Sequence, residues 1–167
     1  RHSAAHVFAQ ALKRIYGDKV KLTIGPWTDE GFYYDIDGIE LEEQDFEEIE
    51  EKMQDIVEED LNIEREMVGR DEAEEFFKDN EFKKQILEEE ASEGEEVSFY
   101  KQGEFKDLCK GPHVESTGKV GGFKLLEIAG AYWRGDEENE MLTRVYGTAF
   151  SSESELDSFL EKRKEAE

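Results

Sequence analysis

Segments with the alternating pattern of β-strands stand toward both ends of this sequence, and helical segments lie between them. The strand-like segments cover residues 20–25, 31–37, 62–68, 96–103, 105–111, 121–130 and 143–150. Apolar residues recur every three or four positions, as on one face of a helix, in 2–16, 45–58, 70–78, 81–90 and from 152 onward. This order predicts an α+β domain with a largely antiparallel sheet packed with helices. The pattern does not determine the order of the strands.

The composition is that of a folded and strongly acidic protein. Of 167 residues, 45 are Asp or Glu and 21 are Lys or Arg, so the net charge is −24. Hydrophobic residues make up 37%, which distinguishes the chain from a disordered acidic tail. The charge argues against tight general binding of nucleic acid through a phosphate-neutralising surface. A solvated acidic surface explains the excess, and a halophilic source would produce the same one.

The sequence also predicts where the protein resides and how it is divided. No stretch approaches the roughly 18 apolar residues of a membrane span, no signal peptide opens the chain, and one cysteine cannot form an internal disulfide. We therefore expect a cytoplasmic protein with no membrane partner. The chain starts without Met and ends in a charged helical pattern, as a piece of a longer polypeptide would. We expect one domain over 1–150 and a C-terminal helix over 151–167 that leads toward a further domain.

All three histidines and the only cysteine fall into two pairs with the same four-residue step. His2 and His6 form an HxxxH pair, and they share one face if residues 2–16 are helical. Cys109 and His113 form a CxxxH pair that a glycine and a proline interrupt. We therefore interpret this second pair as a turn leaving a strand. If the two pairs are functional, they define a cleft that carries both.

Two kinds of site fit these residue types. Four such groups can bind zinc as His₃Cys, or three of them can bind it and leave one position open. They can also form a metal-free acid/base cluster, because imidazole titrates near neutral pH. A structural origin is the third alternative, since a lone cysteine often behaves as a small buried hydrophobe. The spacing alone does not choose between the two functional readings.

Four longer stretches resemble a known family. They are "HSAAHVFAQALKRIYG", "GFYYDID", "DLCKGPHVESTGK" and "FKLLEIAGAYWRGDEENEMLTRVYGTAF". Together, from His2 to Phe150, they resemble the editing domain of bacterial-type threonyl-tRNA synthetase. The related editing domain of alanyl-tRNA synthetase shares the HxxxH and CxxxH pairs.

The resemblance implies an enzyme, an aminoacyl-tRNA ester hydrolase within a threonine–tRNA ligase that takes part in protein biosynthesis. Such a domain removes serine from mischarged tRNA(Thr) and spares threonyl-tRNA(Thr). Serine lacks one methyl of threonine, and one such group is worth only about 1–3 kcal/mol of discrimination in a single pocket. A second, hydrolytic site supplies the remaining accuracy.

The resemblance also assigns the catalytic residues. His2 and His6 would form the floor of the pocket, and Cys109 and His113 its opposite wall. Lys83, after an aromatic residue in "EFKKQIL", matches the functional lysine of the family. Its ammonium would protonate or orient the ribose hydroxyl, or help to hold the attacking water.

Two further residues would bind the substrate. Asp107 matches an acid that binds the amino group of the amino acid, although a surface acid on a strand is the alternative. Tyr33 matches a tyrosine that lines the serine pocket. Strand alternation turns only one of Tyr33 and Tyr34 inward, and we expect Tyr33 to be the one that faces the pocket. Lys83 is likewise chosen over its neighbour Lys84.

The threonyl type that the sequence resembles edits without a metal, so we expect no cofactor. If zinc is bound, its ligands would be His2, His6, Cys109 and His113. The alternative functions are a zinc-dependent deacylase, either alanyl-type or free-standing, and a non-catalytic module that binds the acceptor end of tRNA.

The expected partners are the acceptor end of tRNA(Thr) carrying serine and the remaining domains of the synthetase, which would bind ATP. The isolated chain would be a monomer. A strip of lysines near the motifs would face the acceptor end; it comprises Lys83, Lys84, Lys101, Lys106, Lys110, Lys119 and Lys124.

Overall fold

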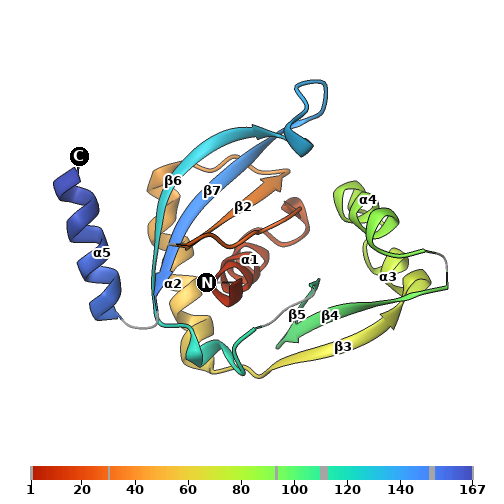
Figure 1. The fold of residues 1–167 in the computed structure, drawn as a ribbon, viewed down its shortest axis with the longest axis horizontal. Helices are drawn as coiled ribbons and strands as arrows, with labels where there is room; N and C mark the ends of the chain where they lie inside the picture. Colours follow the sequence, from red (N-terminus) through yellow and green to blue (C-terminus); the bar gives the residue numbers. More distant parts are fainter. Residues whose placement is uncertain (1, 30, 93, 110–112, 151–152, 167) are drawn as a thin grey trace.

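Two antiparallel sheets carry the strands of this protein (Figure 1). The computed structural model describes residues 2–29, 31–92, 94–109, 113–150 and 153–166. The first sheet has the order β1-β2-β7-β6, with β1 at Lys21–Leu22, β2 at Gly31–Asp37, β7 at Met141–Phe150 and β6 at Gly122–Tyr132. The second has the order β3-β4-β5, with β3 at Ile63–Gly69, β4 at Glu96–Gln102 and β5 at Phe105–Leu108. The α+β class and the antiparallel pairing are confirmed, but the strands divide into two sheets.

Five α-helices accompany these sheets in the described part of the chain. They are α1 at His2–Tyr16, α2 at Phe46–Glu59, α3 at Arg70–Phe76, α4 at Glu81–Glu90 and α5 at Glu153–Ala166. Short 3₁₀ turns occupy Gly17–Lys19, Glu43–Asp45, Thr117–Lys119 and Trp133–Gly135. None of the described helices is long and apolar enough to cross a membrane.

Helix α1 runs through the interior of the domain. Residues 3–12 of this helix are all buried, because α2 and β2 cover it and its N-terminal end lies between the two sheets (Figure 1). The Phe8 ring packs on Phe32 and Tyr34 of β2, with ring centroids 5.9 and 6.0 Å apart. A helix that is apolar almost all round is stable only when it is buried in this way. The first turn of α1, which carries His2, is therefore held inside the molecule.

Helix α4 is attached to the first sheet at its N-terminus. The side chain of Asn80 caps the helix, since its Oδ1 accepts hydrogen bonds from the N–H groups of Phe82 and Lys83. The Asn80 Nδ2 donates to the Leu22 carbonyl of β1 at 2.8 Å. This residue therefore fixes the first turn of α4 relative to β1.

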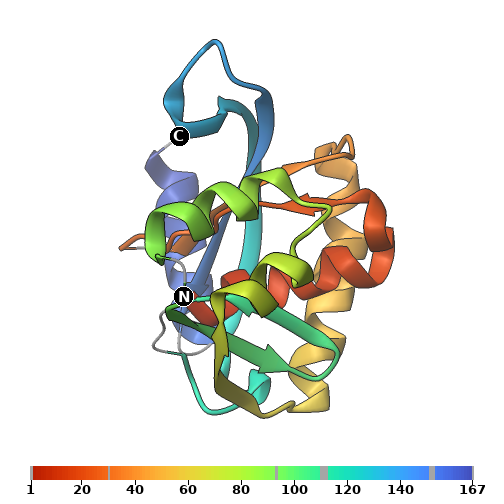
Figure 2. The same cartoon turned by 90° about the vertical axis from the view of Figure 1, so that its right-hand side faces the viewer.

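The tip of the β6–β7 hairpin holds α4 from another side (Figure 1 and Figure 2). The ring of Trp133 packs against Phe82, with centroids 5.0 Å apart, and its Nε1 donates to Gln85 Oε1 at 2.9 Å. Arg134, which has a φ of 59°, forms an ion pair with Glu89. The motif "AYWRGD" therefore packs the hairpin onto α4.

Helix α5 lies along the outer side of β6, far from the second sheet (Figure 1). Its Phe159 packs on Phe150 of β7, with ring centroids 5.1 Å apart, and Leu156 is buried. Arg163 lies 3.8 Å from Glu127 of β6. The C-terminal helix is thus packed onto the first sheet.

Candidate active site

The HxxxH and CxxxH pairs meet in space. His2 and His6 lie one turn apart on α1, and Cys109 directly follows β5. The Cys109 Sγ is 3.3 Å from His2 Nε2 and 3.1 Å from His113 Nε2. The His113 ring centroid is 4.3 Å from those of both His2 and His6. The predicted turn of "CKGPH" falls on 110–112, which lie outside the described residues.

Local structure explains why Cys109 points at the histidines. The Cys109 N–H donates to the Ser98 carbonyl of β4 at 3.1 Å, so pairing continues past the end of β5. Strand alternation then places Phe105, Asp107 and Cys109 on one face, and all three are buried. The ring of Phe105 packs on His6 with centroids 5.9 Å apart.

The hydroxyl of Ser3 orients His113, and the sequence analysis missed this residue. Its Oγ accepts a hydrogen bond from the Val114 N–H at 3.0 Å and lies 3.0 Å from His113 Nδ1. Oγ can donate its own hydrogen to His113 Nδ1 or accept one from it, and in either case the contact fixes the orientation of the ring. The only sequence signal for Ser3 was its position inside the HxxxH pair.

His6 and His113 of this cluster are neutral at physiological pH. Burial lowers the pKa of His6 from 6.5 to about 3, and the positive charges of His2 and Lys83 lower it further. Burial also lowers the pKa of His113 to about 2, with His6 and His2 contributing next. Neutral imidazoles can accept a proton or bind a metal.

The four residues of the two pairs fit a zinc ion. One ligand atom from each of His2, His6, Cys109 and His113 lies within 4.8 Å of all the others. Three imidazoles and one thiol are a donor set that zinc accepts in tetrahedral geometry. Within the described part of the chain, the buried Nδ1 of His6 has no hydrogen-bond partner. Both functional readings of the cluster therefore fit its geometry.

A buried ion pair lies beside this cluster. The Lys83 Nζ is 2.9 Å from Asp107 Oδ1 and 3.2 Å from Oδ2, and the two side chains are only 5% and 4% exposed. Tyr34 donates its hydroxyl to Asp107 Oδ2 at 3.2 Å, and the Leu108 N–H donates to Oδ1 at 2.8 Å. Burial and the neighbouring Asp107 carboxylate raise the pKa of Tyr34 well above 10, so its phenol stays protonated. Lys83 and Asp107 thus meet at the site, and the surface alternative for Asp107 is wrong.

The expectation that Tyr33 lines the pocket is wrong. Alternation along β2 turns Tyr34 toward α1 and Asp107, and it turns Tyr33 to the opposite face of the sheet. There the Tyr33 ring lies 6.0 Å from that of Tyr146 and 4.3 Å from the Arg144 guanidinium. The sequence identified the correct pair of tyrosines but the wrong member.

A hollow of about 200 Å³ joins the cluster and the ion pair. The predicted residues that line it are His2, His6, Lys83, Asp107 and Cys109, together with Tyr34. His113 does not line the hollow, but its Nε2 contacts the Sγ of Cys109, which does. The sequence analysis missed Gly25 and Glu90, which also line the hollow, because neither belongs to a motif with chemical meaning.

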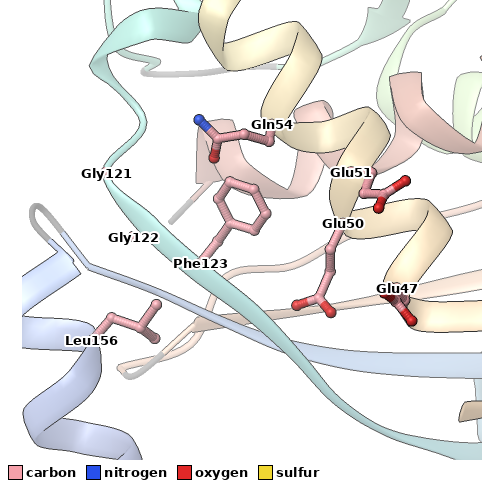
Figure 3. Close-up of a pocket in the computed structure, with 8 residues that line it drawn as sticks. All are labelled: Glu47, Glu50, Glu51, Gln54, Gly121, Gly122, Phe123 and Leu156. Carbon is pink, nitrogen blue, oxygen red and sulfur yellow. The ribbon is translucent and has the colours of Figure 1, made fainter.

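Another hollow, of about 330 Å³, lies between α2, β6 and α5 (Figure 3). Glu47, Glu50 and Glu51 of α2 line one side of it, and Phe123 and Leu156 line the other. No histidine, cysteine or basic residue of the described chain lines it. It lacks the chemistry of the first hollow, and we do not assign it a catalytic role.

The predicted lysine strip is not a free basic surface. Lys83 is buried in its ion pair, and Lys124 pairs with Glu50 at 3.1 Å. The Lys106 Nζ lies over the ring of Phe76 at 5.0 Å. Lys110 lies outside the described residues. The strip therefore provides fewer available cations than its sequence indicated.

The chain is similar to known proteins. A family model described as the threonyl and alanyl tRNA synthetase second additional domain matches residues 97–146. Threonine–tRNA ligase of Haloarcula marismortui is 68% identical over 167 residues, which is 100% of this chain and 26% of that protein. The corresponding ligase of Halobacterium salinarum is 58% identical over 166 residues, and that of Staphylococcus carnosus is 54% identical over 169; each match covers 99% of this chain and 26% of the relative.

Residues 97–146 thus match the second additional domain of threonyl- and alanyl-tRNA synthetases, and the chain along its length is similar to threonine–tRNA ligases. The relatives named above, which match nearly all of this chain, are threonine–tRNA ligases, as the resemblance of its motifs predicted. The chain spans about a quarter of the length of these curated relatives, since it covers 26% of each.

Proposed function

We propose that this domain hydrolyses the ester of seryl-tRNA(Thr), spares threonyl-tRNA(Thr) and works as the editing domain of a threonyl-tRNA synthetase. The observation that carries the proposal is the convergence of imidazoles, a thiol and a buried Lys–Asp pair on one hollow of about 200 Å³. Ester hydrolysis needs a proton acceptor, a proton donor and a site for the amino acid. This hollow offers groups of each kind.

The amino group of serine would bind at Asp107. This carboxylate already accepts hydrogen bonds from Tyr34 and Leu108 and pairs with Lys83, so the substrate ammonium competes with Lys83 for it. Lys83 then becomes available to the ribose oxygen that leaves. Tyr34, which stays protonated, continues to donate to Asp107 and keeps the carboxylate in place.

An imidazole provides the proton acceptor. His2 and His6 line the hollow, and one of them takes a proton as the oxygen of water attacks the ester carbonyl. The bond between the carbonyl carbon and the ribose oxygen then breaks, and Lys83 gives a proton to that oxygen. The products are free serine and a ribose hydroxyl, and the proton held by histidine restores Lys83.

Zinc, if it is bound, would be held by residues of the two pairs; with three of the four as ligands, the open position would allow Lewis-acid activation of water. The steps above depend on side chains alone. The two routes predict different responses to a chelator, which makes the alternative zinc-dependent deacylase testable.

The first experiment is the deacylation of seryl-tRNA(Thr) and threonyl-tRNA(Thr) by the 167-residue chain, with and without chelator. We expect selective loss of serine that the chelator does not change. Lys78→Ala is the matched control, because this lysine is 62% exposed and does not line the hollow. Chelator-sensitive hydrolysis would favour the zinc enzyme, and hydrolysis of both esters at one rate would contradict the proposed substrate.

His6→Ala separates catalysis from binding. A catalytic role predicts that hydrolysis is lost while affinity for the tRNA is nearly kept. Equal losses of hydrolysis and affinity would instead identify a module that only binds the acceptor end.

A further inference from the structure

A larger hollow, of about 500 Å³, lies on the other side of His2. Its walls include Ser3, Trp27, Val114, Lys119 and Phe150. His2 lines both this hollow and the one that contains Lys83 and Asp107. A molecule whose reacting bond lies at His2 can therefore extend from the smaller hollow into the larger one. Its volume is within the range of about 300–1,000 Å³ that is typical of ligand sites.

Trp27 is the most unusual wall of this second hollow. Trp27 is 58% exposed, which is the largest exposed fraction among the large apolar residues of the described chain. Its backbone is nevertheless fixed, because Trp27 forms a β-bridge with Phe32 and the flanking Pro26 carbonyl accepts the Tyr33 N–H at 3.1 Å. An indole that is exposed on a fixed backbone provides a flat, pre-positioned apolar face.

The charge of this hollow differs from that of the whole chain. The net charge of the protein is −24, whereas Lys119 and Glu155 are the charged residues that line the hollow in the described part of the chain. An aromatic face with a nearby cation is the combination that binds single-stranded nucleic acid, through base stacking and phosphate contact. A nucleotide offers both a flat base for the indole and a phosphate for Lys119, whereas an acidic peptide offers only the charge.

We propose that Trp27 is a stacking platform for a base of the single-stranded 3′ end of the tRNA, with Lys119 near the adjoining phosphate. This inference rests on the proposed function, because it places the aminoacyl ester in the smaller hollow. The ester joins serine to a ribose, so the nucleotides must leave the smaller hollow through an opening. The hollow beyond His2 supplies that opening, and Trp27 stands on its wall.

Fluorescence provides a direct test, since the chain has two tryptophans and Trp133 is only 5% exposed. The probe is a CCA oligonucleotide whose 3′ end carries serine through a stable amide. We expect saturable quenching in the native chain and none in Trp27→Phe, where only the buried Trp133 remains. Equal quenching in both proteins would overturn the proposal.

Kinetics on seryl-tRNA(Thr) provide the second readout. Trp27→Ala should raise KM roughly 5- to 150-fold, the range for loss of one stacked base, and leave kcat nearly unchanged. Met67→Ala is the matched control, because Met67 is 48% exposed on β3 and lines neither hollow. Unchanged KM in Trp27→Ala, with active native protein, would overturn the platform alone.

The two proposals fail in different ways. If the native chain binds the probe at Trp27 but hydrolyses no ester, the platform stands and the editing activity does not. If the native chain hydrolyses the ester and no quenching occurs, Trp27 faces another part of the parent protein and the platform is refuted.

Discussion

The Lys83–Asp107 pair permits a quantitative test of how the site is held together. Both side chains are almost fully buried, and their atoms approach to 2.9 Å. Asp107→Asn keeps the shape and the acceptor for Tyr34 but leaves the Lys83 charge unpaired. Breaking a buried pair on one side costs about 3–5 kcal/mol. Lys83→Met should cost a similar amount, because it leaves the carboxylate without its cation.

The double variant Lys83→Met/Asp107→Asn distinguishes this reasoning from a simple sum of contacts. Replacing both charges removes the attraction and the desolvation cost together, so its stability should be close to that of the native chain. Urea unfolding measures the three variants. With a slope of about 2 kcal/mol per molar urea, each single substitution should lower the midpoint by about 2 M.

The exposed pair Lys78–Glu75 is the control, since its side chains are 62% and 75% exposed. Lys78→Met should cost less than about 1 kcal/mol. The reasoning is refuted if the single substitutions at Lys83 and Asp107 also cost less than about 1 kcal/mol, or if their effects add in the double variant. The folded double variant should hydrolyse no seryl-tRNA(Thr), which separates stability from activity.

Four further outcomes follow from the structure. Tyr34→Phe removes a hydrogen-bond donor to the Asp107 carboxylate and should lower the free energy of unfolding by about 1.5–3 kcal/mol. Tyr33→Phe should change this free energy by less than about 0.5 kcal/mol. Equal effects of the two substitutions in urea unfolding would contradict the assignment of faces on β2. Gly25→Ala would place its Cβ 2.3 Å from the Tyr34 ring, so we expect a loss of about 1–3 kcal/mol and slower deacylation, and native stability would show that the ring has room. Trp133→Phe removes the hydrogen bond to α4, so amide exchange in that helix should become about fivefold faster while exchange in α1 stays unchanged; uniform acceleration would indicate global destabilisation. Raising KCl from 0.1 to 1 M shortens the screening length from about 10 to 3 Å. Because the net charge is −24, this weaker self-repulsion should raise Tm. A constant or falling Tm in thermal unfolding would exclude self-repulsion as a major factor in stability.

Local patterns were sufficient for most of the helices and strands, but not for all of their bounds, since the strand predicted over 20–25 forms only at Lys21–Leu22. The segments 2–16, 45–58 and 81–90 coincide with α1, α2 and α4 to within one residue at each end, and 31–37 coincides with β2. Helical and strand periodicity depend on neighbours in the sequence, so they can be read from one chain. The cap at Asn80 belongs to the same local kind of information.

The pairing of the strands could not be predicted in this way. The division into two sheets depends on β2 meeting β7 and on β3 meeting β4, and these partners are far apart in the sequence. The choice between Tyr33 and Tyr34 depends on which face of β2 lies against α1. Likewise, Lys83 looks like a surface lysine in a charged helix, and only tertiary structure buries it against Asp107. Motifs therefore indicated candidate residues that the fold brings together, whereas their orientations depend on the fold.

The distance along the chain between the halves of the cluster has a consequence for synthesis and folding. His2 and Cys109 are 107 positions apart, and Gly31 of β2 pairs with Thr148 of β7. Such non-local contacts raise the relative contact order, which slows folding, because loop closure must precede the gain from contact. In a nascent chain, β7 is synthesised late. Until it is available, the first sheet is incomplete and α1 lacks the surface against which it packs. The cluster of His2, His6, Cys109 and His113 therefore forms only together with the tertiary structure, and a partly folded chain lacks it.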